Sequence, residues 1–116
     1  MRRTIELTAE QVTAMHPQSP PTDVVMVRSV NAGVFYGEFV SRENDVVILR
    51  GARRCWYWSG AASLSQLATT GTTNPNACKF PTPTTGEHII LGVCEIIPVT
   101  ATALASLDSV PVWRQS

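Results

Sequence analysis

The sequence predicts a β-rich α+β fold, in which a small, bent antiparallel barrel carries two or three short helices. Three observations support this fold class. Apolar, strand-like runs follow one another with only short turns between them, a glycine interrupts one of these runs, and short segments carry helix-capping patterns. The chain has 116 residues, which fits one domain. We expect an N-terminal segment over 1–22 and a single β-rich main domain over 23–116.

The N-terminal segment is predicted to hold a short strand, a short helix and a proline-rich linker. Residues 4–7 alternate as a strand does, and Thr8 with Gln11 forms a capping box for a helix over 9–15. Three prolines follow between residues 16 and 21. Because proline removes a backbone donor and fixes φ, the helix cannot continue through them.

Three strand-like runs open the main domain, at 24–30, 34–41 and 46–49. Gly37 lies inside the second run, where a glycine often marks a bulge or a bend that lets a sheet curl. This pattern resembles small SH3-like or Sm-like barrels. Residues 53–58 form a fourth run or continue the third beyond a bend.

Two further helices are predicted from capping patterns. Ser63 and Gln66 form a capping box ahead of an apolar face, and Thr100 can cap a helix over 101–107. Both helices are short, which suits a fold that consists mainly of strands.

The remaining segments of the main domain are a loop, a strand and a tail. Residues 69–86 are rich in Thr, Pro, Asn and Gly and predict a long loop, and 88–99 reads as one strand. The apolar residues 110–113 are expected to be extended and to pack on the domain or on a neighbouring subunit.

Composition narrows the class of function. The formal net charge is zero, so no global basic field attracts duplex nucleic acid or an anionic membrane, although a local basic patch remains open. Charged residues are only 16% of the chain, which favours a homo-oligomer because a partner then covers part of the surface. Cys55, Cys78 and Cys94 are interpreted as free thiols in a reducing cytoplasm, and no signal peptide or membrane span is predicted.

Catalytic and metal-binding patterns are weak. Cys55 or Cys78 with His88 could form a nucleophilic pair only through proximity in the fold, and the same side chains lack the paired spacing of a zinc site. The sequence has no phosphate-binding Gly-Lys-Ser/Thr loop and no GxGxxG pattern. We therefore expect no enzyme, no cofactor and no metal.

The segment RRCWYWSG, residues 53–60, is the strongest candidate for a binding site. On a strand, Arg54, Trp56 and Trp58 would share one face, because side chains alternate. A guanidinium beside two indoles can hold a phosphate and stack a planar base. With Arg53 and Ser59, which leads into a helix start where N–H groups favour an anion, these residues form the predicted ligand site.

The competing interpretation is structural. Tryptophans in strands are often core residues, and the arginines beside them are often solvated or paired at the surface. Under this interpretation Trp56 and Trp58 pack in the interior, and the site lies elsewhere, with the loop over 69–86 as the next choice. Trp113 is expected to pack rather than to contact a ligand.

Four stretches together resemble a known family: GARRCWYWSGAASLSQL at 51–67, CKFP at 78–81, CEIIPVTATA at 94–103 and SVPVW at 109–113. The family consists of small phage and prophage proteins and is known only as a domain of unknown function. The resemblance runs over roughly residues 24–113, and it implies a phage origin and a bacterial host cytoplasm. No catalytic residues are assigned in that family, so none can be transferred.

Two functions fit these observations about equally. The first is a non-catalytic phage accessory protein that binds a nucleotide-like small molecule, as do sponges that sequester a host immune second messenger. The second is a protein-interaction module that inhibits a host defence protein or serves in phage structure or assembly. Single-stranded nucleic-acid binding is a third, less favoured function, because the chain is neutral.

Overall fold

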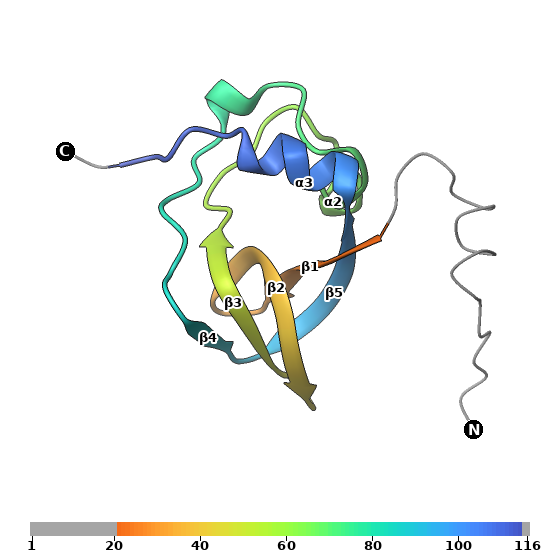
Figure 1. Ribbon diagram of the computed structural model, residues 1–116, viewed down its shortest axis with the longest axis vertical. Coiled ribbons are helices and arrows are strands. Elements are labelled where there is room, and N and C mark those ends of the chain that lie inside the picture. Colours follow the sequence, from red (N-terminus) through yellow and green to blue (C-terminus); the bar gives the residue numbers. More distant parts are fainter. Residues whose placement is uncertain (1–20, 115–116) are drawn as a thin grey trace.

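Five strands and two α-helices form the computed structural model, which describes residues 21–114 (Figure 1). The elements are β1 (Pro21–Ser29), β2 (Gly33–Glu43), β3 (Val46–Arg54), α2 (Leu64–Thr70), a short 3-10 helix η1 (Pro75–Ala77), β4 (Glu87–Ile90), β5 (Val93–Thr100) and α3 (Ala101–Asp108). The strand over 4–7, the helix over 9–15 and most of the proline-rich linker lie outside the described residues. Pro21, which the sequence assigned to the linker, begins β1.

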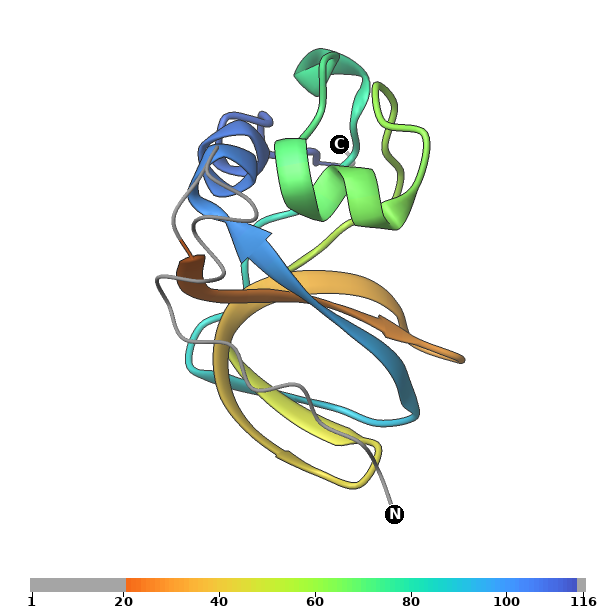
Figure 2. The same ribbon diagram turned by 90° about the vertical axis from the view of Figure 1, so that its right-hand side faces the viewer.

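The strands form one antiparallel sheet in the order β4-β3-β2-β1-β5. The two edge strands, β4 and β5, do not pair with each other within the described residues, so the sheet is open. The β-rich α+β class is therefore confirmed, whereas closure into an SH3-like or Sm-like barrel is not. Figure 2 shows the sheet curling strongly, with α2 and α3 side by side at one end of it.

The curl begins at Gly37 in β2. The pairing of β2 with β3 shifts register between Tyr36 and Glu38, on either side of this glycine. A Cβ atom on Gly37 would lie 3.0 Å from the Cα of Ala52 and 3.1 Å from the carbonyl oxygen of Arg50. The two backbones can approach this closely only because the glycine has no side chain, which confirms the predicted irregularity in this strand.

The third predicted run and the start of RRCWYWSG belong to one strand. β3 continues from Val46 through Arg54, so the predicted continuation is confirmed. Beyond Arg54 the chain leaves the sheet, and Tyr57 pairs with Lys79 in an isolated antiparallel bridge. The strand alternation assumed over 53–58 therefore applies only to its first residues.

The prediction of one strand over 88–99 was wrong. β4 ends at Ile90 and β5 begins at Val93, and the chain reverses between them. Gly92 has φ 69°, in the left-handed region that an L side chain rarely adopts, and it permits this turn. Leu91, within this turn, is apolar although it is exposed. The apolar run in the sequence therefore continues across the turn and gave no sign of a break.

Both predicted helices of the main domain are confirmed, with their caps. Ser63 Oγ accepts from the N–H of Gln66 at 3.1 Å, and Gln66 Oε1 accepts from the N–H of Ala62 at 2.9 Å. Thr100 Oγ1 accepts from the N–H of Ala103 at 3.0 Å. Each side chain satisfies a backbone donor that a helix start leaves unpaired.

Two apolar clusters fill the fold, one on each side of the sheet. The first lies between the sheet and the helices and includes Tyr36, Leu67 and Leu107. The second lies inside the curl and consists of Val27, Phe35, Val47, Leu49, Ala52 and Ile90. Adjacent residues of β2 point to opposite clusters, as the two-residue period of a strand requires.

The segment after α3 packs back on the domain, which was one of the two expected outcomes. Val110 is buried in the first cluster, and Val112 pairs with Phe80 in a parallel bridge. The N–H of Trp113 donates to the carbonyl oxygen of Phe80 at 2.9 Å.

Candidate functional site

Arg53 lies in the interior, although it belongs to the predicted ligand site. It is only 5% exposed. Its guanidinium has five N–H donors, and the structure records a hydrogen bond for each of them. The acceptors are the carbonyl oxygens of Pro81 (2.9 Å), Phe80 (3.2 Å), Val110 (2.8 Å) and Leu107 (3.2 Å) and the hydroxyl of Tyr36 (3.2 Å). Arg53 thus ties β3 to the loop before β4 and to the segment after α3, and we call this arrangement the Arg53 clasp.

Tyr36 extends the Arg53 clasp to the end of α3. Its hydroxyl accepts from Arg53 and donates to Asp108 Oδ1 at 2.9 Å. Burial raises the pKa of Tyr36 above its ordinary value, and the bond to Asp108 raises it further, whereas Arg53 lowers it. The phenol therefore stays neutral, as a donor to Asp108 must.

Cys55 comes just after the end of β3 and lies on the same interior side as Arg53. It is buried in the first cluster, and burial raises the pKa of its thiol. A thiol held in the neutral form is a poor nucleophile. His88 packs against Phe35 of the second cluster, so the residues considered as a nucleophilic pair belong to different sides of the sheet.

Arg54 points to the other side of β3 and lines an open pocket. Its guanidinium carbon lies 4.3 Å from the centroid of the Phe35 ring, which is a cation–π distance. One of its N–H groups donates to the carbonyl oxygen of Ala32, the one side-chain hydrogen bond recorded for Arg54 within residues 21–114. Most of its donors therefore remain available to a bound group.

This cavity, the Phe35 pocket, has a volume of about 380 Å³. It is lined by Asn31, Ala32, Phe35, Arg54, His88, Ile89, Ile90, Leu91 and Gly92. The His88 ring packs edge-on against Phe35 with centroids 5.1 Å apart, and His88 Nδ1 lies 3.2 Å from Thr84 Oγ1. None of the described residues that line the pocket is a carboxylate, so its polar groups suit an anion.

Two turns form the walls of the Phe35 pocket and are bonded to each other. Ser29 Oγ donates to the carbonyl oxygen of Leu91 at 2.6 Å, and the N–H of Val30 donates to the carbonyl oxygen of Gly92 at 3.0 Å. The pocket is therefore largely pre-formed. Its rim is apolar, because the lining residues Ile89 and Leu91 are 61% and 64% exposed, and the neighbouring Val30 is 73% exposed.

The other predicted site residues do not line this pocket. Trp56 is 64% exposed, which rules out the interior position of the competing interpretation. Trp58 is half-buried and packs against the first cluster, on the far side of the sheet from Arg54's partner Phe35. The structure therefore separates Trp58 from Arg54, because the chain leaves the sheet between them.

Ser59 and the start of α2 offer little to an anion. The Ser59 carbonyl oxygen accepts from the hydroxyl of Thr72 and from Cys78 Sγ, the latter at 3.6 Å. At the helix start, side-chain oxygens of Ser63 and Gln66 already accept backbone N–H groups. At the predicted anion site, the N–H of Gln66 is therefore already bonded to the cap side chain of Ser63.

Sequence reasoning missed the residues that complete the Phe35 pocket. His88, Ile89 and Leu91 come from β4 and the turn after it, more than thirty positions from Arg54 in the sequence. A signal was present, because Ile89 and Leu91 are exposed apolar residues beside a glycine turn. This signal could be recognised only after residues 88–99 were known to form two strands instead of one.

Within residues 21–114, no three His, Cys, Asp or Glu side chains gather as ligands for a metal ion. No described helix has the length and apolarity to cross a bilayer.

Comparison with known proteins identifies a family without assigning an activity. Searches of curated proteins and of solved structures found no match. One family model matches residues 22–107, which is most of the chain. The matched range includes the five strands, both α-helices and the Phe35 pocket, and it leaves out only the first residue of β1 and the last residue of α3. The chain therefore belongs to the family described as Domain of unknown function (DUF6948).

Proposed function

We propose that this protein is a non-catalytic binding protein that holds a nucleotide-like small molecule in the Phe35 pocket. The observation that carries the proposal is Arg54, a half-buried guanidinium that stacks on Phe35 and uses one of its N–H groups in a hydrogen bond within residues 21–114. A guanidinium fork matches the oxygens of a phosphate, and a pocket without carboxylates does not repel one.

The apolar parts of the pocket suit the rest of such a ligand. Ile89 and Leu91 offer aliphatic surface beside Arg54, against which a base or ribose can pack. His88 provides a ring nitrogen as a further polar contact next to Thr84. A few polar groups within a mainly apolar lining are typical of ligand pockets.

The biological role belongs to the same proposal. The protein is a phage accessory protein that sequesters a host immune second messenger, and it acts as a homo-oligomer in the host cytoplasm. The phage origin rests on the resemblance of residues 51–67, 78–81, 94–103 and 109–113 to phage and prophage proteins. Sequestration requires tight binding without turnover, which suits a pocket lined mainly by apolar side chains with Arg54 as its cation.

Thermal unfolding with a panel of cyclic nucleotides and ADP-ribose derivatives tests the ligand class. A ligand at one hundred times its dissociation constant adds about 2.7 kcal/mol, which raises the melting temperature of a domain this size on the order of 10 °C. Arg54→Ala should abolish the shift, and Arg42→Ala, which removes an exposed cation on the β2–β3 hairpin, should keep it. No shift with any member of the panel would reject the ligand class.

A second candidate is the protein-interaction module, and the pocket rim favours it. Val30, Ile89 and Leu91 expose aliphatic surface near β4, whose outer edge has no strand partner among the described strands. Exposed apolar groups beside an open strand edge suit a host protein or a phage assembly component. A pull-down that recovers one stoichiometric host protein with the wild type, and loses it with Ile89→Asp, would favour this candidate over the first.

A further inference from the structure

A second surface of the molecule includes residues 55–58, the part of RRCWYWSG that follows the end of β3. Three extended segments lie side by side there, over residues 55–58, 78–81 and 110–114. Lys79 N–H donates to the carbonyl oxygen of Tyr57 at 2.8 Å, and its own carbonyl oxygen accepts from the N–H of Trp56 at 3.1 Å. Trp113 is attached to the middle segment through Phe80 at 2.9 Å. Hydrogen bonds between the three segments therefore hold in place the backbone that carries the side chains of this surface.

Lys79 lies between two aromatic rings on this surface. Its Nζ is 5.9 Å from the centroid of Tyr57 and 5.7 Å from the centroid of Trp113, both within cation–π range. We call Tyr57, Lys79 and Trp113 the aromatic ladder. None of the three lines the Phe35 pocket.

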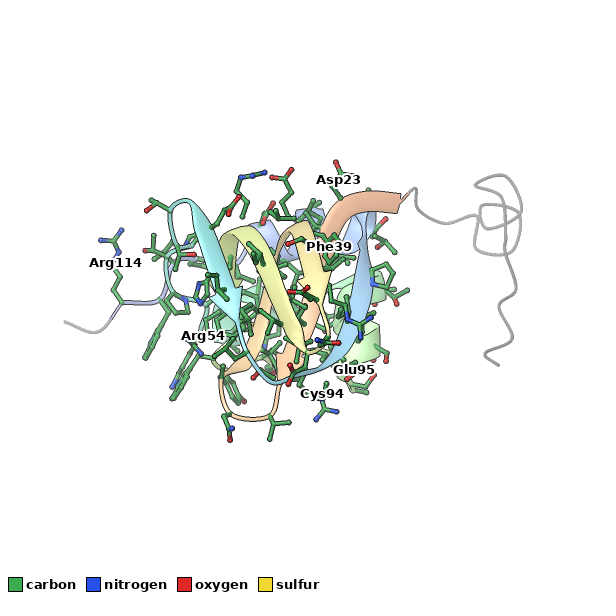
Figure 3. All side chains as sticks on the ribbon, turned by 90° about the horizontal axis from the view of Figure 1, so that it is seen from below. Asp23, Phe39, Arg54, Cys94, Glu95 and Arg114 are labelled. Carbon is green, nitrogen blue, oxygen red and sulfur yellow. The ribbon has the colours of Figure 1, made fainter. Side chains whose placement is uncertain are left out.

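The charge around the aromatic ladder has one sign. The three segments contain Lys79 and Arg114, both exposed, and no Asp or Glu. Arg114 extends away from the body of the domain (Figure 3). The nearest carboxylate along the chain, Asp108, already accepts from Tyr36. A chain of zero net charge thus carries a local surface on which two cations lie beside the exposed ring of Tyr57 and the half-buried ring of Trp113.

We infer that the aromatic ladder binds single-stranded nucleic acid. Bases stack on the rings of Tyr57 and Trp113, and the phosphates contact Lys79 and Arg114. A proline-rich peptide would also pack on aromatic rings, but it has no phosphates to pair with Lys79 and Arg114. Because the chain has zero net charge, we expect its affinity for nucleic acid to be modest, confined to this surface and easily weakened by salt.

Fluorescence anisotropy of a labelled oligothymidylate of about 12 nucleotides, a length within the usual site sizes, tests the inference. Binding is expected at low salt, with quenching of tryptophan fluorescence. The logarithm of affinity should fall against the logarithm of salt concentration with a slope of about −1.4, since two phosphate contacts contribute about −0.7 each. The same sequence as a duplex should bind more weakly, because its bases are not free to stack on the rings.

Variants of the full chain assign the binding to the aromatic ladder. Tyr57→Ala and Trp113→Ala should each weaken affinity by about 5- to 150-fold, the range for loss of one stacked base. Tyr57→Phe keeps the ring and should bind like the wild type. Lys79→Gln should reduce the salt slope by about 0.7, whereas Arg42→Gln, a distant exposed cation, should leave it unchanged. Thermal melts of each variant separate loss of binding from loss of folding.

Several outcomes would overturn the inference. Absence of binding at low salt, or binding that Tyr57→Ala and Tyr57→Phe affect equally, would remove the stacking role. Binding of a polyproline peptide with the same dependence on Tyr57, and no binding of the oligonucleotide, would assign the surface to peptides instead. Arg54→Ala should leave oligonucleotide binding intact, so failure here is distinguishable from failure of the Phe35 pocket proposal.

Discussion

Arg53 and Arg54 are neighbours at the end of one strand and have opposite environments. Arg53 is buried and donates all five of its N–H groups to protein acceptors. Arg54 lies at an open pocket, stacks on Phe35 and makes one hydrogen bond within the described residues. The difference arises because β3 points successive side chains to opposite sides of the sheet, one closed by the helices and the segment after α3, the other partly open.

Residue type alone therefore does not show whether an arginine supports the fold or binds a ligand. Both arginines suit a phosphate by chemistry alone, yet only one has donors to offer. A guanidinium whose donors are all paired with buried carbonyl oxygens serves the fold, and one with unpaired donors beside an aromatic ring can serve a ligand. The interior side should therefore respond to substitution through stability, and the Phe35 side through binding.

The largest expected effect is on the interior side. Arg53→Ala leaves four buried carbonyl oxygens without this donor, at about 1–3 kcal/mol for each unsatisfied group and with incomplete additivity. We expect the free energy of unfolding to fall by about 3–5 kcal/mol, measured by urea denaturation. Arg50→Ala on the same strand loses only exposed ion pairs with Glu38 and Glu87 and should cost less than about 1 kcal/mol. Equal effects of the two substitutions would contradict the comparison.

The next effect is the pH dependence that Cys55 contributes. Burial raises the pKa of its thiol in the folded state, so its contribution is complete below the unfolded pKa of about 8.5 and is lost as the pH rises above that value. One such group changes the free energy of unfolding by about 1.4 kcal/mol per pH unit, or about 2 kcal/mol between pH 8.5 and 10. The stability difference between the wild type and Cys55→Ala, followed by denaturation under reducing conditions, should shrink by this amount. Parallel pH profiles would show that Cys55 ionises equally in both states.

A smaller effect is expected at Tyr36. Tyr36→Phe removes one hydroxyl that accepts from Arg53 and donates to Asp108, and it should lower the free energy of unfolding by about 1–2 kcal/mol. Because burial raises the pKa of Tyr36, the stability contributed by the neutral phenol is lost as the pH rises above about 10. The variant should therefore lose less stability than the wild type in that range. Tyr57→Phe, on the aromatic ladder, is the matched control and should change stability little.

The smallest effect on stability is expected on the pocket side. Arg54→Ala removes one cation–π contact and one hydrogen bond at a half-buried site, so it should cost about 1 kcal/mol in the same denaturation assay. Trp56→Ala, at an exposed position, should change stability by less than about 0.5 kcal/mol. A loss of several kcal/mol in Arg54→Ala would mean that both sides of β3 support the fold.

The sequence predicted what depends on neighbours along the chain. Capping by Ser63 and Thr100 and the irregularity at Gly37 rest on contacts or geometry that local sequence specifies. The alternation of β3 also separated Arg53 from Arg54 correctly. The sequence could not show which of the two arginines was interior, because both have the same local pattern.

The rest depends on distant segments. Acceptors for Arg53 lie 17 to 57 positions away in the sequence, and the Phe35 pocket requires β4 and the turn at Gly92. Trp58 was grouped with Arg54 on the assumption that the strand continued, whereas β3 ends at Arg54. No local pattern encodes where a strand stops when the residues beyond it remain aromatic.

The Arg53 clasp has a consequence for how the molecule opens. Since one guanidinium holds carbonyl oxygens of Val110, Leu107 and Phe80, the segment after α3 cannot detach without also breaking contacts of the loop before β4. This segment should therefore not fray as an independent unit but open cooperatively with the domain. Slow hydrogen exchange at the amide of Trp113, which donates to Phe80, would be its signature, and Arg53→Ala should convert it to fast local exchange.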